Sequence, residues 1–369
     1  MSGTSMDAID AALVDFEDGI RLLASHSEPL PHNLRRDLEA LIEPGNNELA
    51  RLAQLDVQFG RLCAAAVAAL LGAEGSAAAV RAIGLHGQTI RHLPEGEFPT
   101  TLQIGDPNIV AEQTGIATVA DLRRRDIAAG GQGAPLVPAF HAATLHDPTQ
   151  DRVVVNIGGI ANITCLPADT CQAVTGFDTG PGNTLMDIWY RTHNPGACDT
   201  DGAWAAGDTP DDSLLQALLA DAFFKQAPPT STGREYFNLS WLQGRLADHS
   251  GLPAQRVQAT LCELTAVSIA AAIEASTPAT REVLICGGGV HNSYLMQRLT
   301  THMPKRNVSS TAQQGVPPDW VEAMAFAWLA RQTLQGEPGN LPSVTGAHHP
   351  VVLGAIYQGR TKGKGKRGN

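Results

Sequence analysis

Short apolar runs alternate with longer amphipathic segments along the whole chain. Apolar residues recur at helical spacing in segments 33–43 and 47–72, which predicts two helices, and Gly72 ends the second. The short runs predict strands, which lie at 9–16, 20–26, 80–85, 116–120, 151–157 and 163–166. Strands that alternate with helices in this way are typical of an α/β protein.

The pattern begins twice. A Gly/Ser/Thr loop at 1–7 precedes the strand at 9–16, and a second small-residue turn at 156–162 separates two later strands. This weak, long-period duplication predicts two α/β lobes with a cleft between them. We expect an N-terminal lobe over 1–148, a C-terminal lobe over 149–359, and a solvated basic tail over 360–369.

The first loop has a strand on one side only. A loop of this kind normally joins two strands, and in this sequence only the strand at 9–16 follows it. We therefore expect that a first strand was lost by truncation or start-site choice, or that the first sheet is one strand short.

Composition and charge disfavour several classes of function. The 369 residues are 43% apolar and 17% charged, as in soluble globular proteins. A net charge of −11 and 5% aromatics disfavour nucleic-acid binding. No apolar stretch reaches 18 residues and the N-terminus lacks signal-peptide features, so we expect a cytoplasmic protein without a membrane segment. The six cysteines form no CxxC pair, which disfavours a zinc ribbon or a thioredoxin motif.

Both small-residue turns can hold phosphate oxygens. Glycines let the backbone approach a ligand closely, and Ser and Thr leave amides and hydroxyls to donate. Asp7 is close enough in sequence to hold a metal ion through water. The predicted nucleotide-binding residues of the two turns are Gly3, Thr4, Ser5, Met6, Asp7, Ala8, Ile9, Asp10, Asn156, Gly158 and Gly159.

Two further glycine-rich segments carry candidate chemistry. Asp178 follows a strand and stands between glycines, where a general base could reach a substrate; it could also cap the following helix. A late strand runs into three glycines that permit a base or ribose to approach the backbone. GxGxxG is absent from this late segment, and no P-loop occurs anywhere in the chain. The nucleotide-binding residues expected here are Thr179, Gly180, Gly287, Gly288, Gly289 and Asn292.

Together these segments resemble the superfamily of sugar kinases, heat-shock chaperones and actin. Within it, the chain resembles the anhydro-N-acetylmuramic acid kinase family over residues 1 to about 357. The motifs that carry this resemblance are MSGTSMD at 1–7, GLHGQT at 84–89, LQIGD at 102–106, GGQGAPLVP at 130–138, NIGGIAN at 156–162, FDTGPGN at 177–183 and GNLPSVTGA at 339–347. Two departures stand out: the family's strand before the first loop is absent, and Ala8 replaces a glycine.

The resemblance implies two ribonuclease H-like lobes of the actin-like ATPase fold, closing on ATP. It implies a kinase that uses ATP and Mg²⁺ to open a 1,6-anhydro amino sugar and phosphorylate O6 during peptidoglycan recycling. Asp178 would be the catalytic base. Arg123 would bind a lactyl carboxylate. The residues expected on the sugar side are His86, Gln88, Asp121, Arg123, Asp126 and Glu322.

For several of these residues, a structural role without substrate binding remains open. His86 could be purely structural, Asp121 and Asp126 could neutralise the neighbouring arginines, and Glu322 could lie on a helix surface. The chain could phosphorylate another sugar or anhydro sugar, serve as a chaperone or filament ATPase, or sense a sugar without catalysis. A homodimer is compatible with the sequence.

Overall fold

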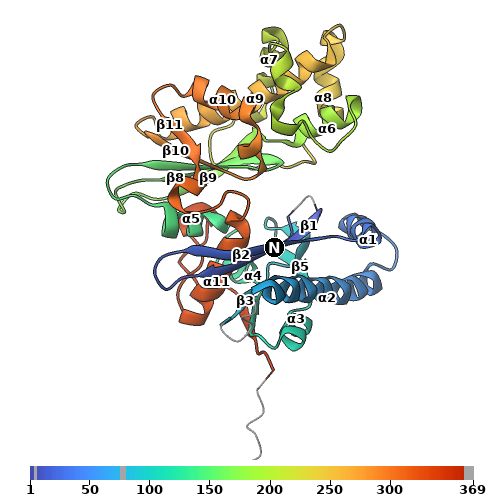
Figure 1. The fold of residues 1–369 in the computed structure, drawn as a ribbon, viewed down its shortest axis with the longest axis vertical. Coiled ribbons are helices and arrows are strands. Elements are labelled where there is room, and N and C mark those ends of the chain that lie inside the picture. The colour runs from blue at the N-terminus through green and yellow to red at the C-terminus, as the bar shows by residue number, and fades with distance from the viewer. Residues whose placement is uncertain (4–5, 75–79, 361–369) are drawn as a thin grey trace, which may run out of the picture. The chain divides into compact units, whose positions relative to one another are not determined.

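The computed structural model describes residues 1–3, 6–74 and 80–360. The chain forms two compact units, Met1–Phe140 with Glu322–Asn369 and His141–Val321 (Figure 1). The sequence-based division placed all of 149–359 in the second lobe, and the structure differs there. The chain returns to the first unit after residue 321, because β12 (Ala355–Tyr357) pairs with β6 (Thr118–Ala120). Beyond Arg360, the predicted tail lies outside the described residues.

The first unit contains three small sheets. β1 (Ala8–Asp15) pairs antiparallel with β2 (Arg21–Pro29), and β4 (Gln88–Leu93) with β5 (Thr100–Ile104). β3 (Ile83–Gly84) runs parallel to β6. The predicted strands at 9–16, 20–26, 80–85 and 116–120 are therefore confirmed in position.

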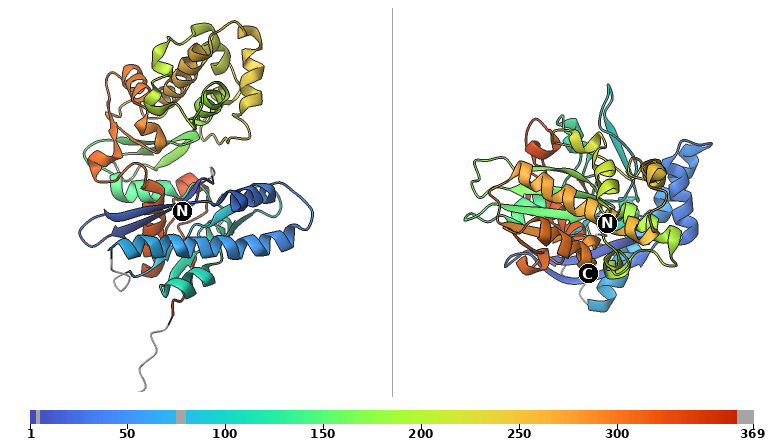
Figure 2. Two further views of the ribbon diagram at one scale, coloured as in Figure 1. Left: turned by 45° about the vertical axis from the view of Figure 1, so that its right-hand side comes forward. Right: turned by 90° about the horizontal axis from the view of Figure 1, so that it is seen from above.

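Helices enclose the core of this unit. α2 (Glu48–Glu74) packs against the β1–β2 hairpin (Figures 1 and 2). It carries the helical apolar spacing noted in the sequence, and buries Leu55, Phe59 and Cys63. The other helices of this unit are α1 (His32–Ile42), α3 (Pro107–Thr114), α4 (Arg124–Ala128), α5 (Val137–Leu145), α11 (Val321–Gln335) and α12 (Pro342–Thr345), of which α5 and α11 extend across the boundaries between the units.

The second unit is a five-stranded sheet with the strand order β11-β10-β7-β8-β9. β10 runs parallel to both β7 and β11, whereas β8 is antiparallel to β7 and β9. The bounds are β7 (Arg152–Ile157), β8 (Ile160–Leu166), β9 (Thr175–Pro181), β10 (Glu282–Cys286) and β11 (Asn307–Ser310).

Helices α6–α10 lie on one face of this sheet (Figure 1). Val153, Val155 and Ile285 of the sheet share a core with Leu261 and Ile269 of α9. The helices are α6 (Thr184–His193), α7 (Asp212–Leu219), α8 (Leu239–Leu246), α9 (Ala254–Ser276) and α10 (Ser293–His302), and short 3₁₀ turns include η6 (Gly288–His291).

Two helices are long and apolar enough to cross a membrane by length and composition, Glu48–Gly72 and Ala254–Ser276. The sequence expectation had found no such segment. In both helices much of the apolar window, 44% and 67%, is buried inside the protein. Since Phe59 and Ile269 lie in the cores of their units, both helices serve as core helices here.

Candidate active site

In the second unit the glycine turn between β7 and β8 meets the start of α6 through backbone alone. The amide of Gly182 donates to the carbonyl of Gly159 at 2.9 Å, and the amide of Asn183 to that of Gly158 at 2.8 Å. A Cβ on Gly182 would stand 2.3 Å from the Gly158 oxygen, so only glycine permits this approach. A Cβ on Gly158 would meet no clash, because the nearest atom, the Ile160 carbonyl oxygen, would be 3.7 Å away.

The triple glycine after β10 packs against the same turn. Gly287 has φ +78°, and a Cβ there would collide with Asn156, while a Cβ on Gly289 would collide with Ile157. On Gly288, by contrast, the nearest atom to an added Cβ is 3.8 Å away. Gly287 and Gly289 are therefore required by the fold. Gly288 leaves room that a ligand can use.

Asp178 lies in β9, with its carboxyl group held by the segment that follows η4 (Phe223–Lys225). The amide of Thr232 donates to Oδ2 at 2.9 Å, and the Thr230 hydroxyl donates to the Asp178 carbonyl. Burial raises the pKa of Asp178 to about 6; the Thr232 bond opposes this shift and the charge of Glu235 adds to it. A carboxyl with this pKa is ionised at neutral pH, yet it is a stronger base than an exposed aspartate.

Three other residues of this unit that were predicted to bind the nucleotide make contacts that stabilise the fold. Thr179 is buried and donates its hydroxyl to the Ala161 carbonyl at 3.2 Å. Gly180 has φ +135° and packs on Phe224. Asn292 caps α10, accepting from the amide of Leu295 at 2.9 Å. Their role in nucleotide binding stays a prediction.

In the first unit His86 and Arg123 form a buried pair. Arg123 donates to His86 Nε2 from Nε at 3.2 Å and from Nη2 at 2.8 Å. Burial and the Arg123 charge hold the pKa of His86 well below its usual value, so the ring is neutral. Because Nε2 accepts from Arg123, the ring proton lies on Nδ1. Phe326 of α11 contacts the His86 ring, with centroids 4.7 Å apart.

Arg123 is a buried cation with incomplete compensation. Its Nη1 donates to the Gly133 carbonyl at 2.9 Å, and no ion pair within residues 1–3, 6–74 and 80–360 involves it. Burial lowers the pKa of Arg123 to about 10, and Glu322 acts in the opposite direction. Burial likewise raises the pKa of Glu322, with Arg123 opposing. The buried pair of His86 and Arg123 therefore lies in an apolar setting that can accept a further anionic group.

Asp126, predicted as a sugar ligand, is instead fully buried and saturated with bonds. Its Oδ1 accepts from Asn340 at 2.6 Å and from Thr345 at 2.7 Å, while Oδ2 accepts from the Gly133 amide at 2.7 Å. This carboxylate ties the glycine-rich loop after α4 to α12 and the segment before it. We therefore leave Asp126 out of the sugar site.

The remaining sugar-side candidates lie on three different segments of the chain: β4, the turn after β6, and α11. Gln88 is buried and accepts from the Ser2 hydroxyl at 2.8 Å, which links β4 to the first loop. Asp121 adopts φ +58° and pairs with Arg124 at 2.7 Å. Glu322 stands in the first turn of α11.

The first loop is described in part. Thr4 and Ser5 lie outside the described residues. Nothing lies within 4 Å of a Cβ built on Gly3, and Met6 has φ +51°. Asp7 is exposed and pairs with Arg35 at 2.6 Å. Ala8, Ile9 and Asp10 belong to β1, and Ala8 is absent from the positive-φ residues, so its replacement of glycine costs no backbone strain.

Sequence reasoning missed several residues that shape these sites. Thr230 and Thr232 hold Asp178, and Phe326 contacts His86. The TSTG stretch at 230–233 was a usable signal, since small hydroxyl residues and glycine favour such turns. Phe326 gave no signal, because an apolar residue in an apolar helix is the ordinary case.

Comparison with known proteins identifies the family of the chain. A model of the anhydro-N-acetylmuramic acid kinase family matches residues 1–359. The chain belongs to this family. The anhydro-N-acetylmuramic acid kinase of Pseudomonas paraeruginosa (strain DSM 24068 / PA7) is 53% identical over 358 residues, which cover 97% of each chain. That of Coxiella burnetii (strain RSA 493 / Nine Mile phase I) is 50% identical over 360 residues, 97% of this chain and 96% of the relative.

Solved structures include a ROK family glucokinase from Streptomyces griseus, with glucose and AMPPNP. It is 14% identical, covers 89% of this chain and 97% of that one, and has a TM-score of 0.39. The family model confirms the predicted membership of the anhydro-N-acetylmuramic acid kinase family. The observed helices and sheets confirm the α/β class, and the actin-like arrangement stays a prediction. The interlobe cleft stays a prediction.

Substituting Asp126 should destabilise this family member without touching an exposed surface. In Asp126→Asn an amide NH₂ replaces an oxygen that accepts from a buried donor, at a cost of roughly 3 kcal/mol. The matched control is Asp121→Asn, which removes a partly exposed ion pair and should cost less than about 1 kcal/mol. Urea unfolding measures both, and equal losses would contradict the structural role of Asp126.

Gly288→Val should weaken nucleotide binding in a folded protein. The Cβ of the added side chain would stand 3.8 Å from the nearest atom, Nδ2 of Asn183, and would clash with nothing. The Tm should therefore stay unchanged, while the KM for ATP rises about tenfold or more and the KM for the sugar changes little. Gly289→Val is the control: its side chain collides with Ile157 and should lower the Tm. Steady-state kinetics and thermal unfolding decide, and equal effects of Gly288→Val on both KM values would refute the assignment.

Proposed function

We propose that this chain is an ATP-dependent kinase that opens 1,6-anhydro-N-acetylmuramic acid and phosphorylates O6. The products are N-acetylmuramic acid 6-phosphate and ADP, formed during recycling of cell-wall fragments, which fits a cytoplasmic location. The family supports this reaction. The observation that carries the mechanism is the Asp178 carboxyl, with a pKa raised to about 6 and one oxygen oriented by the Thr232 amide.

The reaction couples one bond opening to one phosphoryl transfer. Asp178 takes a proton from water as the water oxygen bonds to C1. The C1–O6 bond of the anhydro bridge breaks, and O6 attacks the γ-phosphorus, releasing ADP. Asp178 then returns its proton to solvent. Since the departing O6 goes to phosphorus, no separate acid is needed to protonate it.

Backbone amides of the two glycine turns would hold the nucleotide phosphates. An added Cβ would meet no clash on Gly158 or Gly288 and would meet open space on Gly3 of the first unit. No cluster of three or more His, Cys, Asp or Glu side chains suited to a metal ion exists in the part of the chain that the structure describes. Mg²⁺ therefore fits as an ion held mainly by phosphate oxygens, with Asp7 acting through water, and it would neutralise charge on the transferring phosphoryl group.

On the sugar side, Arg123 would bind the lactyl carboxylate. Its guanidinium is buried, already fixed by His86 and Gly133, and without an ion pair among the described residues. A carboxylate ligand would supply the missing countercharge. Neutral His86 fixes the guanidinium plane without competing for the anion.

An assay of ADP release tests the function as a whole. Purified protein with ATP and Mg²⁺ is given 1,6-anhydro-N-acetylmuramic acid, N-acetylglucosamine or no sugar. We expect ADP release only with the anhydro sugar, together with one 6-phosphate per ADP by mass spectrometry. Turnover with N-acetylglucosamine would favour a plain sugar kinase, and sugar-independent turnover would favour a chaperone-like ATPase.

Asp178→Asn should lower kcat by about 10²–10⁴-fold with little change in sugar affinity, because the amide cannot take the proton. In the parent enzyme kcat/KM should fall as the pH drops below about 6, where Asp178 becomes protonated. Glu235→Gln is the companion variant: removing its negative charge should shift this limb to lower pH. A limb that Glu235→Gln leaves unmoved would send the search to another base.

Arg123→Lys should reduce discrimination for the lactyl group. Lysine keeps the charge but loses the planar pair of donors, so the KM for the anhydro sugar should rise about tenfold while that for the analogue lacking the lactyl group stays constant. Arg124→Lys, on an exposed arginine paired with Asp121, is the control and should change neither value. An equal rise for both substrates would place Arg123 outside the lactyl site.

A further inference from the structure

An arginine side chain lies over the glycine turn between β7 and β8. A Cβ built on Gly159 would stand 3.4 Å from Cδ of Arg234 and 3.7 Å from its Cγ, which is ordinary van der Waals contact. The arginine stem therefore covers the place where a side chain on this turn would stand. Because the guanidinium group begins one bond beyond Cδ, its hydrogen-bond donors lie close to any ligand held at the turn.

The backbone beneath this stem is anchored. The carbonyl of Gly159 accepts from the amide of Gly182 at 2.9 Å and from the amide of Thr184 at 3.1 Å. These two bonds tie the turn to the end of β9 and to the first residue of α6. The surface on which the Arg234 stem rests is therefore set before a ligand binds.

The segment that carries Arg234 is fastened to Asp178 by three hydrogen bonds. The amide of Asp178 donates to the Thr230 carbonyl at 2.9 Å, and the Thr230 hydroxyl donates to the Asp178 carbonyl at 2.5 Å. The Thr232 amide donates to Oδ2 of Asp178 at 2.9 Å. Since Arg234 follows Thr232 by two residues, one short segment positions both a carboxylate and a cation.

Beyond Arg234 the same segment enters an aromatic cluster. The amide of Phe237 donates to the Gly233 carbonyl at 3.1 Å, and Phe237 is fully buried. Its ring centroid lies 5.3 Å from that of Phe223 and 5.1 Å from that of Trp241. Arg234 thus stands between two fixed points of the chain, Thr232 and Phe237, while its own side chain is exposed, as a group that meets a ligand must be.

Other arginines of the second unit serve different contacts. Several form ion pairs with carboxylates of the same unit: Arg152, Arg245, Arg256, Arg298 and Arg306. Arg234, by contrast, has its stem on the turn that we propose as a phosphate site. Its position singles it out as the cation for that site.

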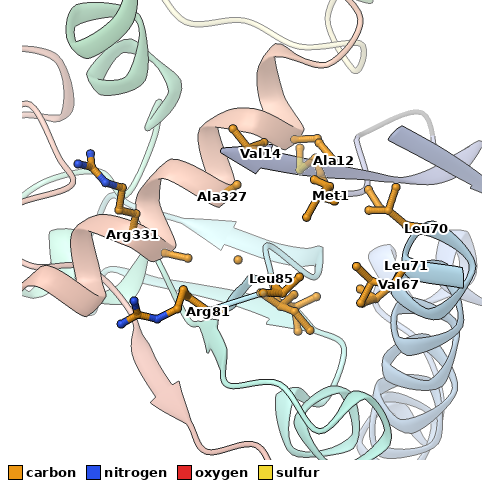
Figure 3. A pocket seen from close by; sticks show the side chains of 18 of the residues that line it. Met1, Ala12, Val14, Val67, Leu70, Leu71, Arg81, Leu85, Ala327 and Arg331 are labelled. Carbon is orange, nitrogen blue, oxygen red and sulfur yellow. The ribbon is translucent and has the colours of Figure 1, made fainter. Parts of the chain in front are cut away.

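The cavity of the first unit is less suited to phosphate. It has a volume of about 790 Å³, and Arg81 and Arg331 line it together with apolar side chains of α2 (Figure 3). The Arg331 guanidinium lies over the Phe16 ring, 5.6 Å from its centroid. The lining also includes Asp15 and Glu17, whose negative charges repel phosphate. The turn of the second unit is therefore the better place for the phosphate chain.

We propose that Arg234 is a catalytic residue whose guanidinium donates hydrogen bonds to oxygens of the γ-phosphoryl group of ATP. This inference rests on the proposed function, in which the β7–β8 turn holds the nucleotide phosphates. The planar guanidinium presents donors in pairs and stays protonated at any working pH, which suits it to two oxygens of one phosphoryl group.

The role of Arg234 is electrostatic. The bond from the γ-phosphorus to the ADP oxygen breaks as the bond to O6 forms, and negative charge is spread over the phosphoryl oxygens and ADP. Arg234 stabilises this charge without giving up a proton or bonding to phosphorus. Asp178, held by the same segment, takes the proton from water. The segment 230–237 thereby aligns ring opening with phosphoryl transfer.

Nucleotide binding without sugar tests the contact directly. Calorimetry in Mg²⁺ compares ADP with AMPPNP, an ATP analogue that keeps the γ-phosphate. Arg234→Ala should raise the Kd for AMPPNP about tenfold or more and leave the Kd for ADP nearly unchanged, and Arg234→Lys should lie between Arg234→Ala and the parent. Unchanged AMPPNP binding, or equal losses for both nucleotides, would overturn the proposal.

Arg281→Ala is the matched control. It removes an exposed arginine of the same unit that precedes β10, at the opposite end of that strand from the triple glycine. Both nucleotide affinities should stay at the parent values. Asp178→Asn should also keep the ratio of the two affinities, because the base does not contact the γ-phosphate.

Kinetics with added guanidinium ion separates a catalytic role from a structural one. Arg234→Ala should lower kcat by about 10³-fold or more, and guanidinium chloride at millimolar concentration should restore about tenfold of this loss. Ammonium chloride should restore none, because it lacks the planar pair of donors. Failure of guanidinium to raise kcat would assign the loss to a displaced segment and overturn the catalytic role.

The parent protein distinguishes this inference from the proposed function. If the parent loses its preference for AMPPNP in Arg234→Ala but releases no ADP with 1,6-anhydro-N-acetylmuramic acid, the phosphate contact stands and the proposed substrate is wrong. If the parent turns over the anhydro sugar and Arg234→Ala does so equally well, only the role of Arg234 is wrong. A parent without affinity for either nucleotide would overturn both.

Discussion

Close approach of backbone to backbone at the glycines of the second unit is the constraint on which its site depends. Gly182 and Gly289 stand where any side chain would collide with the turn between β7 and β8. Their contacts bring the end of β9, the start of α6 and the triple glycine around one turn. At Gly158 and Gly288, by contrast, an added Cβ would meet no protein atom closer than 3.7 Å.

Burial of ionisable groups gives the two units different chemistry from similar scaffolds. In the second unit, burial raises the pKa of Asp178 and makes it a stronger base. In the first unit, burial of Arg123 beside a neutral His86 leaves a cation whose charge no ion pair of the described residues balances. Burial thus strengthens a base in one unit and leaves an uncompensated cation in the other.

The sequence was sufficient for elements whose signal is local. Helical spacing in 47–72 and the short apolar runs of the β7–β8 hairpin predicted α2 and that hairpin well. The sequence was insufficient where contacts between residues far apart in the chain determine a residue's role or its place in the fold. Asp126 looked like a sugar ligand because it stands beside arginines, and only its bonds to Asn340 and Thr345, more than two hundred residues away, show its structural role. The return of the chain to the first unit after residue 321 is a further long-range pairing, between β12 and β6.

The small-residue loops of the two units are held by different contacts. In the second unit both ends of the turn continue into paired strands, so its amides are fixed before a nucleotide arrives. In the first unit β1 fixes one end of the loop at 1–7, while the other end is tied by the Met1–Asp10 pair and the Ser2–Gln88 bond. Preorganised amides bind phosphate better than amides that must be ordered on binding.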